Sequence, residues 1–220
     1  ETCANPAVPI RGFADLTVFV NPAFEAAELR SLLETARGYG GYCPSQTPLA
    51  LIAMSESDRA TGVAFPLGRK LATLAQGFRG EERAQAVTAI GHYPPFDTHR
   101  LTRVGDPPAQ LDPARRAADC GCATALGHFD PARHLANLRR NGESRDFKNL
   151  HFALSRSYGG SRLSQLPGLA LPADLPFLVA RVEPAIIDGH GDFFNPSFID
   201  FLVNFVAAID YKRAAWEEAD

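Results

Sequence analysis

The side chain best placed for chemistry is His190, which stands in a loop between an expected strand and an expected helix. The strand is the apolar run Phe177–Val182, and the helix begins near Pro196 with Asn195 as a suitable N-cap. A histidine held between two such elements can be positioned accurately, and an imidazole exchanges protons near neutral pH. The alternative is a histidine that only caps a neighbouring element or lies exposed in its loop.

Asp58 is the acid that would pair with this histidine. It follows the apolar segment 49–54, an expected strand, at the end of the sequence Ser-Glu-Ser-Asp. In acyl-transfer enzymes a carboxylate fixes the tautomer of the imidazole, and the histidine accepts the proton of the nucleophile. Glu56 lies in the same turn and is the rival acid. Alternatively, Asp58 only stabilises the first turn of the helix that follows it.

Alternating strands and helices are expected to bring the two residues together. Continuous apolar runs predict buried strands, and amphipathic patterns predict a helix after each of them. The strands are expected at 16–20, 49–54 and 177–182, and the helices at 22–36, 66–76 and from 196 onward. This order predicts a parallel sheet, in which a site forms beyond the carboxyl ends of the strands. Asp58 and His190 are both expected at that edge.

One face of each helix should meet the core. In the helix expected at 66–76, Leu67, Leu71 and Leu74 are predicted to point inward. The closing helix carries a longer apolar stripe, formed by Phe198, Phe201, Leu202, Phe205, Val206 and Ile209.

The chain divides into three stretches. Residues 1–100 are expected to form an α/β core of two strands and two helices, with an additional edge strand at 84–90. Residues 101–171 lose hydrophobic periodicity, which predicts a loop-rich, lid-like insertion with a short helical piece at 131–139. Residues 172–220 are expected to supply the last core strand, the histidine loop and the closing helix.

Composition argues against several classes of function. The chain has 220 residues, 45% of them hydrophobic and 21% charged, which is typical of a globular protein. A net charge of −3 gives no basic surface for nucleic acid, and no apolar run reaches the length of a membrane span. The sequence opens at Glu1 without a signal peptide, so we expect a processed chain or a piece of something longer.

The four cysteines leave the cellular compartment open. They are Cys3, Cys43, Cys120 and Cys122. The Cys-Gly-Cys spacing differs from zinc-binding pairs, which have roughly two to four residues between ligands. Disulfides in an exported protein and reduced thiols in a cytosolic one both fit the set, and we favour an exported protein.

The nucleophile that should accompany such an acid and histidine is missing. Serine enzymes with this order of acid and histidine carry their serine in Gly-x-Ser-x-Gly, at a turn from strand to helix. No such motif occurs in the chain. Around Ser144 and Ser161 the final glycine is absent, and neither serine follows an expected strand.

Four segments of the chain nevertheless resemble a family of bacterial α/β-hydrolase-fold proteins of the esterase or lipase type. They are VFVNPAFEA at 18–26, SESDRATGVAFPLGR at 55–69, GHYPPFDTHRL at 91–101 and GHGD at 189–192. In that family the matching segments lie in the C-terminal half, downstream of a Gly-His-Ser-x-Gly elbow. The resemblance implies an α/β fold: the C-terminal half of an α/β-hydrolase parallel sheet, with a long lid-like insertion before the last strand.

The resemblance also implies roles for individual residues. Asp58 would be the acid and His190 the general base, without a cofactor. The serine and the oxyanion hole would come from an N-terminal half or a second chain. The segment that contains His92 and His99 would line the pocket or be structural, with His99 hydrogen-bonded inside a turn. We also consider Tyr158 as a pocket residue, because it stands beside two glycines in the sequence.

The function expected is hydrolysis of a small ester through an acyl-enzyme. Half a sheet would leave a long unpaired strand edge, so we expect this chain to fold against the missing segment. Two other classes stay open. One is a catalytically inactive binding or scaffold protein of the same fold. The other is a metal-dependent hydrolase that uses histidines such as His92 and His99 with Asp97, although no histidine pair has a known ligand spacing.

Overall fold

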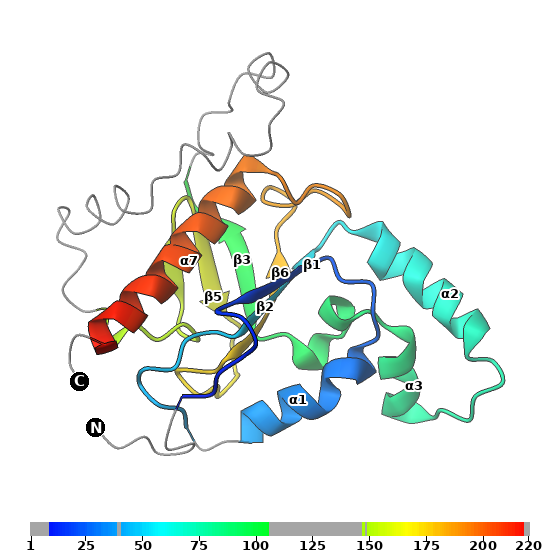
Figure 1. The fold of residues 1–220 in the computed structure, drawn as a ribbon. Coiled ribbons are helices and arrows are strands. Elements are labelled where there is room, and N and C mark those ends of the chain that lie inside the picture. The colour runs from blue at the N-terminus through cyan, green and yellow to red at the C-terminus, as the bar shows by residue number, and fades with distance from the viewer. Residues whose placement is uncertain (1–8, 39–40, 106–146, 148, 218–220) are drawn as a thin grey trace, which may run out of the picture.

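A six-stranded mixed sheet forms the centre of the molecule, and helices lie on both of its faces (Figure 1). The computed structural model describes residues 9–38, 41–105, 147 and 149–217. The strands follow the order β1-β2-β6-β3-β5-β4 across the sheet. The fold is therefore of the α/β class.

The sheet has a parallel part and an antiparallel part. The strands are β1 (Thr17–Val20), β2 (Ala50–Ser55), β3 (His99–Arg103), β4 (Arg156–Tyr158), β5 (Ser161–Gln165) and β6 (Phe177–Val182). Strand β2 pairs in parallel with β1 and with β6, and β6 pairs in parallel with β3. Strand β5 runs antiparallel to β3, and β4 runs antiparallel to β5. The carboxyl ends of β1, β2 and β6 consequently meet at one edge.

Helical segments connect the strands. They are α1 (Ala26–Gly38), the π-helical turn η1 (Ala60–Ala64), α2 (Phe65–Ala72), α3 (Gly80–Val87), the 3-10 turns η2 (Ile90–His92) and η3 (Pro94–Phe96), and α7 (Pro196–Glu217). Helix α7 covers one face of the sheet, and α1 and η2 lie at the other (Figure 1).

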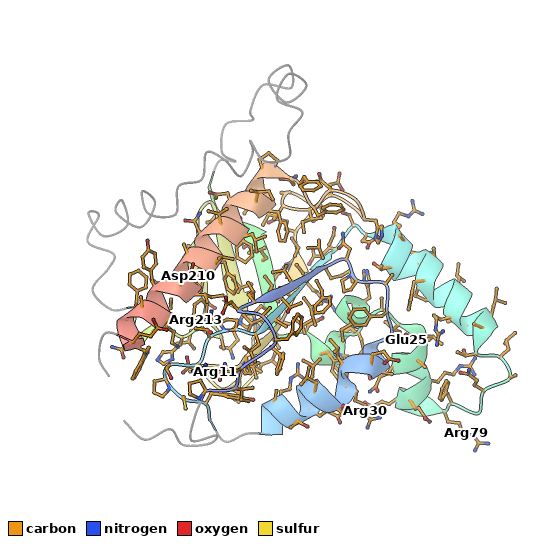
Figure 2. All side chains as sticks on the ribbon, viewed as in Figure 1. Arg11, Glu25, Arg30, Arg79, Asp210 and Arg213 are labelled. Carbon is orange, nitrogen blue, oxygen red and sulfur yellow. The ribbon has the colours of Figure 1, made fainter. Side chains whose placement is uncertain are left out.

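Alternate residues of the central strands fill the two halves of the core. On β2, Leu51 and Ala53 pack in one cluster with Phe201 and Phe205 of α7, and all four residues are fully buried. Figure 2 shows side chains filling the space between α7 and the sheet. Ile52 points to the opposite side and packs in the cluster of α1 and η2. Burial on both faces explains why the central strands are continuous apolar runs rather than alternating ones.

The strands expected at 16–20, 49–54 and 177–182 are confirmed as β1, β2 and β6. Helices follow the first two as expected, and α7 begins at Pro196. Its stripe is mostly buried, through Phe198, Phe201, Phe205 and Ile209, whereas Val206 is exposed.

Two expectations for the first hundred residues are wrong. The edge strand predicted at 84–90 is the helix α3 followed by η2. Acidic residues Glu81 and Glu82 in its first turn favour this helix through the helix dipole. The three leucines expected to point inward, Leu67, Leu71 and Leu74, are 59%, 71% and 70% exposed. Helix α2 ends at Ala72, so only Leu67 and Leu71 lie on it, and their face does not meet the core.

The stretch 101–171 contributes to the sheet. Strands β4 and β5 lie within it and extend the sheet beyond β3. Strand β4 has three residues and β5 has Leu163 as its one apolar residue, which explains why hydrophobic periodicity did not reveal them. The helical piece expected at 131–139 and the cysteines Cys120 and Cys122 lie outside the described residues.

Cys43 is buried and forms a disulfide bond, so the four cysteines are not all reduced. Among the helices in the described ranges, none has the length and apolar character needed to cross a membrane.

Candidate active site

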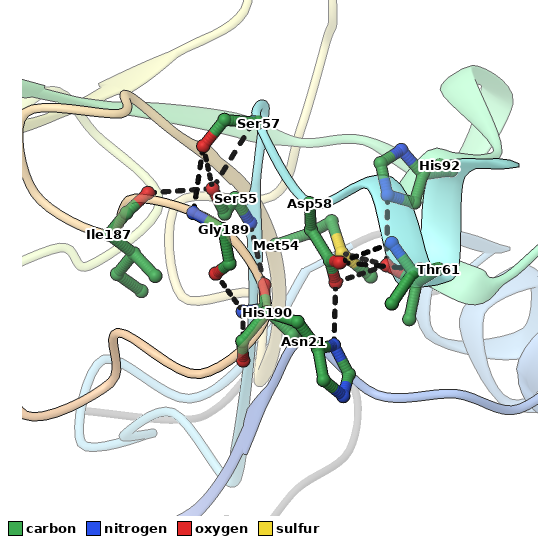
Figure 3. Close-up of polar contacts among 11 residues, drawn as sticks. Asn21, Met54, Ser55, Ser57, Asp58, Thr61, His92, Ile187, Gly189 and His190 are labelled. Atoms are coloured by element: carbon green, nitrogen blue, oxygen red, sulfur yellow. Dashed lines mark hydrogen bonds and ion pairs between the residues drawn. The ribbon is translucent and has the colours of Figure 1, made fainter. Parts of the chain in front are cut away.

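Asp58 and His190 meet at the carboxyl edge of the sheet, although 132 residues separate them in sequence (Figure 3). Asp58 follows β2 and His190 lies in the loop that follows β6, and these two strands are neighbours. The Nδ1 atom of His190 lies 2.9 Å from Oδ2 of Asp58. The sequence therefore identified two residues that the structure brings into hydrogen-bond contact.

The carboxylate of Asp58 is surrounded by hydrogen-bond donors. Its Oδ1 accepts the backbone N–H of Ala60 at 2.9 Å and that of Thr61 at 3.3 Å. Its Oδ2 accepts the Thr61 hydroxyl and the His190 ring N–H. Burial alone would raise the pKa of Asp58, but the hydrogen bonds from Thr61, His190 and the two backbone amides hold this pKa below its ordinary value. The acid is thus ionised at neutral pH and fixed in orientation.

The other ring nitrogen of His190, Nε2, takes no part in the contact with Asp58. Because Nδ1 donates to the Asp58 carboxylate, Nε2 of the neutral imidazole carries no hydrogen and can accept a proton. The side chain is 53% exposed. No hydrogen bond joins Nε2 to any residue in the described part of the chain. An imidazole oriented in this way by a carboxylate is able to act as a general base.

Asn21 ties the histidine loop to the ends of β1 and β2. Its Nδ2 donates to the carbonyls of Gly189 at 2.9 Å and His190 at 3.1 Å, and its Oδ1 accepts the Ser55 N–H at 2.8 Å. Asn21 has a φ of 46°, and asparagine tolerates this left-handed conformation better than most residues. The Asn-Pro pair directly after an expected strand is a local signal of a turn, but no local pattern indicates the distant partners of Asn21.

The isosteric change Asn21→Asp is expected to destabilise the protein by about 2 kcal/mol, because a carboxylate would face two carbonyl oxygens that now accept hydrogen bonds. The matched change Asn21→Gly tolerates the positive φ and removes the side chain, so it should cost less at neutral pH. Urea denaturation of both variants measures the difference. Equal stability of Asn21→Asp and the unaltered protein would contradict this account of the loop.

Two serines beside the pair also hold the loop. Ser55 donates from Oγ to the carbonyl of Ile187 at 2.6 Å. Ser57 accepts the N–H of Gly189 at 2.8 Å and donates to Asp188 at 3.0 Å. Neither hydroxyl hydrogen-bonds to His190, so both serines position the loop.

The remaining sequence candidates lie in different surroundings. Glu56, the rival acid, pairs with Arg100 at 3.0 Å and has no hydrogen bond to His190. Tyr158 is not a mobile pocket residue but is buried on β4, with its ring against those of Phe201 and Phe205. Its two neighbouring glycines form the turn into β5, which the sequence alone did not reveal.

His92 lies close to the pair. Its Nε2 is 3.1 Å from Oγ1 of Thr61, the same hydroxyl that donates to Asp58. It also lines a pocket of about 280 Å³, together with Met54, Ser55, Glu56, Gly91 and Arg181. Sequence reasoning considered His92 but missed Thr61, because threonine is common at the start of a helix and nothing local marks this one.

His99 lies in strand β3 rather than in a turn, and it is fully buried. Its Nε2 donates to the carbonyl of Ala153 at 3.0 Å, and its Nδ1 lies 2.8 Å from the Thr98 hydroxyl. Burial lowers its pKa to about 4, and the hydrogen bond to Ala153 opposes this shift only in part. His99 is therefore a neutral structural residue.

Acidification should destabilise the protein through His99. Its pKa is lower in the folded state than the ordinary 6.5, so the stability it contributes is complete above 6.5 and is lost as the pH falls toward 4. Between pH 7.5 and 5, His99→Gln should lose about 2 kcal/mol less unfolding free energy than the unaltered protein. Urea titrations at both pH values measure this. The variant has to be compared with the unaltered protein because burial also raises the pKa of Asp97 to about 6. This second shift increases the unfolding free energy as the pH falls, which opposes the effect of His99.

The proposed metal ligands do not converge. His92 contacts Thr61, His99 contacts Thr98 and Ala153, and Asp97 pairs with Arg181 at 2.5 Å. Within the described ranges, no group of three or more His, Cys, Asp or Glu side chains could hold a metal ion.

Comparison of the chain with protein-family models, with curated proteins and with solved structures found no match.

Proposed function

We propose that this chain supplies the acid and the general base of a serine hydrolase of the α/β-hydrolase type that acts on an ester. The observation that carries the proposal is the hydrogen bond between His190 and the buried, ionised Asp58, which leaves the second ring nitrogen of a half-exposed His190 without a hydrogen-bond partner among the described residues. Adjacent parallel strands hold both residues at the carboxyl edge, where sites of α/β sheets form.

In the proposed reaction Nε2 of His190 removes the proton of a serine hydroxyl as its oxygen attacks the ester carbonyl carbon. Asp58 stabilises the imidazolium that results. The imidazolium then protonates the departing alcohol, and an acyl-enzyme remains. Water attacks this acyl group with His190 again as the base, which releases the acid and regenerates the serine.

The serine would come from an upstream segment or from a second chain. No Gly-x-Ser-x-Gly elbow occurs in the 220 residues, and Ser55 and Ser57 are engaged in holding the loop. Among the described residues β1 pairs with β2 alone, which leaves its other edge available. A strand that added in parallel to β1 would end at the same edge of the sheet as Asn21.

Stopped-flow hydrolysis of p-nitrophenyl acetate by the natively purified protein, with its associated polypeptides, tests the proposal. An acyl-enzyme predicts an initial burst of nitrophenol followed by slower steady turnover, unaffected by a chelator. Turnover that a chelator abolishes and zinc restores would favour the metal-dependent alternative instead. A preparation without turnover that binds small ligands would favour the non-catalytic binding protein.

A further inference from the structure

The hydroxyl of Thr61 stands between Asp58 and His92. It lies within hydrogen-bond distance of Oδ2 of Asp58, 3.1 Å from Nε2 of His92, and 3.3 Å from the sulfur of Met54 (Figure 3). Thr61 is 1% exposed, as is Met54, so the hydroxyl is enclosed by these partners. The Thr61 hydroxyl has a single proton. The partner to which it donates this proton therefore determines whether each remaining partner donates or accepts.

The proton directions follow from the chemistry of the three groups. An ionised carboxylate only accepts hydrogen bonds, so Thr61 must donate its proton to Asp58. The hydroxyl oxygen then accepts from His92, which requires the hydrogen of that ring to be on Nε2. The result is a chain of donors that runs from His92 through Thr61 to Asp58.

Two glycines allow His92 to approach this hydroxyl. A Cβ on Gly62 would lie 3.0 Å from Cε1 and 3.2 Å from Nε2 of the His92 ring, so the ring packs directly on the backbone of η1. A Cβ on Gly91 would lie 2.3 Å from Cβ of Met54, which means that η2 lies directly against β2. Close contact at both glycines fixes the ring where it meets Thr61.

We propose that His92 is a positioning residue of the active site, which holds the Thr61 hydroxyl aimed at Asp58 and thereby fixes the carboxylate for His190. This inference rests on the proposed function. A hydroxyl that accepts one hydrogen bond donates another more strongly, because neighbouring hydrogen bonds polarise each other. Without His92, the hydroxyl could turn toward Met54 and leave Asp58 with one donor fewer.

The charges around His92 suit this role. Burial lowers its pKa, the Asp58 carboxylate raises it, and the Arg181 guanidinium lowers it, with a net shift below the ordinary value. His92 is therefore neutral at pH 7, and its ring does not compete with the imidazolium of His190 for the charge of Asp58.

Paired substitutions separate positioning from packing. Thr61→Val and His92→Leu keep the approximate size and remove the donor, and both should lower kcat about tenfold to a hundredfold with KM changed less than about twofold. Thr61→Ser and His92→Gln keep a donor and should retain kcat within about threefold. Full kcat in Thr61→Val and His92→Leu, with the unaltered protein active, would overturn the inference alone. No hydrolysis by the unaltered protein would instead overturn the proposed function.

The tautomer of His92 gives a second test that does not need activity. Nitrogen-15 NMR of the imidazole at neutral pH should show the hydrogen on Nε2. A hydrogen on Nδ1 would overturn the donor chain, even if the threonine and histidine variants proved unstable.

Discussion

Replacement of His190 by alanine is expected to lower ester hydrolysis by at least about 10⁴-fold, because His190 is the one histidine among the described residues that hydrogen-bonds directly to Asp58. The folded state should change little, since the side chain is 53% exposed and the contacts of the loop to Asn21 use backbone carbonyls of Gly189 and His190. Steady-state kinetics, with circular dichroism as a check of folding, measure both expectations.

His151→Ala is the matched control for this variant. His151 also pairs with an aspartate, Asp174, at 2.9 Å, but through a contact that does not involve the site. Its replacement should leave kcat within about twofold. Normal hydrolysis by His190→Ala would contradict the role of His190, whatever the control shows.

Replacement of Asp58 by asparagine is the second large effect, with an expected loss of about 10³ to 10⁴ in kcat. The amide oxygen would take the place of Oδ1, which accepts two backbone N–H groups from Ala60 and Thr61. The amide nitrogen would then replace Oδ2 and donate to His190. This forces the hydrogen of the neutral imidazole onto Nε2, the atom that has to accept the proton.

Glu56→Gln is the control for Asp58→Asn, because Glu56 lies two residues away and pairs with Arg100 on the surface. It should leave kcat within about twofold. A loss in Glu56→Gln as large as the loss in Asp58→Asn would show that the acid was assigned wrongly. Steady-state kinetics of the two variants, purified in the same way, decide this.

Sequence patterns predicted the part of the fold that depends on continuous apolar runs. Strands β2 and β6 are largely buried on both faces and β1 is partly buried, and each is a mostly hydrophobic segment. Strands β4 and β5 carry exposed polar residues such as Arg156 and Arg162, and they are too short to show an alternation. Their place in the sheet depends on pairing with β3, which no local pattern encodes.

The same distinction applies to the site. Asp58 and His190 could be predicted because each follows an expected strand of a parallel sheet, and such ends converge. Asn21 acts on carbonyls 168 and 169 residues away, and the link between Thr61 and His92 spans 31 residues. These roles arise only when the chain has folded. The exposed leucines of α2 illustrate the converse, because periodicity defines a face but not what the face meets.

Fluorophosphonate labelling of the natively purified protein, followed by intact-mass analysis, tests most directly whether this chain works on a serine supplied from elsewhere. We predict that the label attaches to an upstream segment or to a second polypeptide, that these 220 residues stay unmodified, and that the His190→Ala preparation is labelled far more slowly. A label on a serine within the 220 residues would contradict the external nucleophile. No labelling at all would contradict serine chemistry at this site.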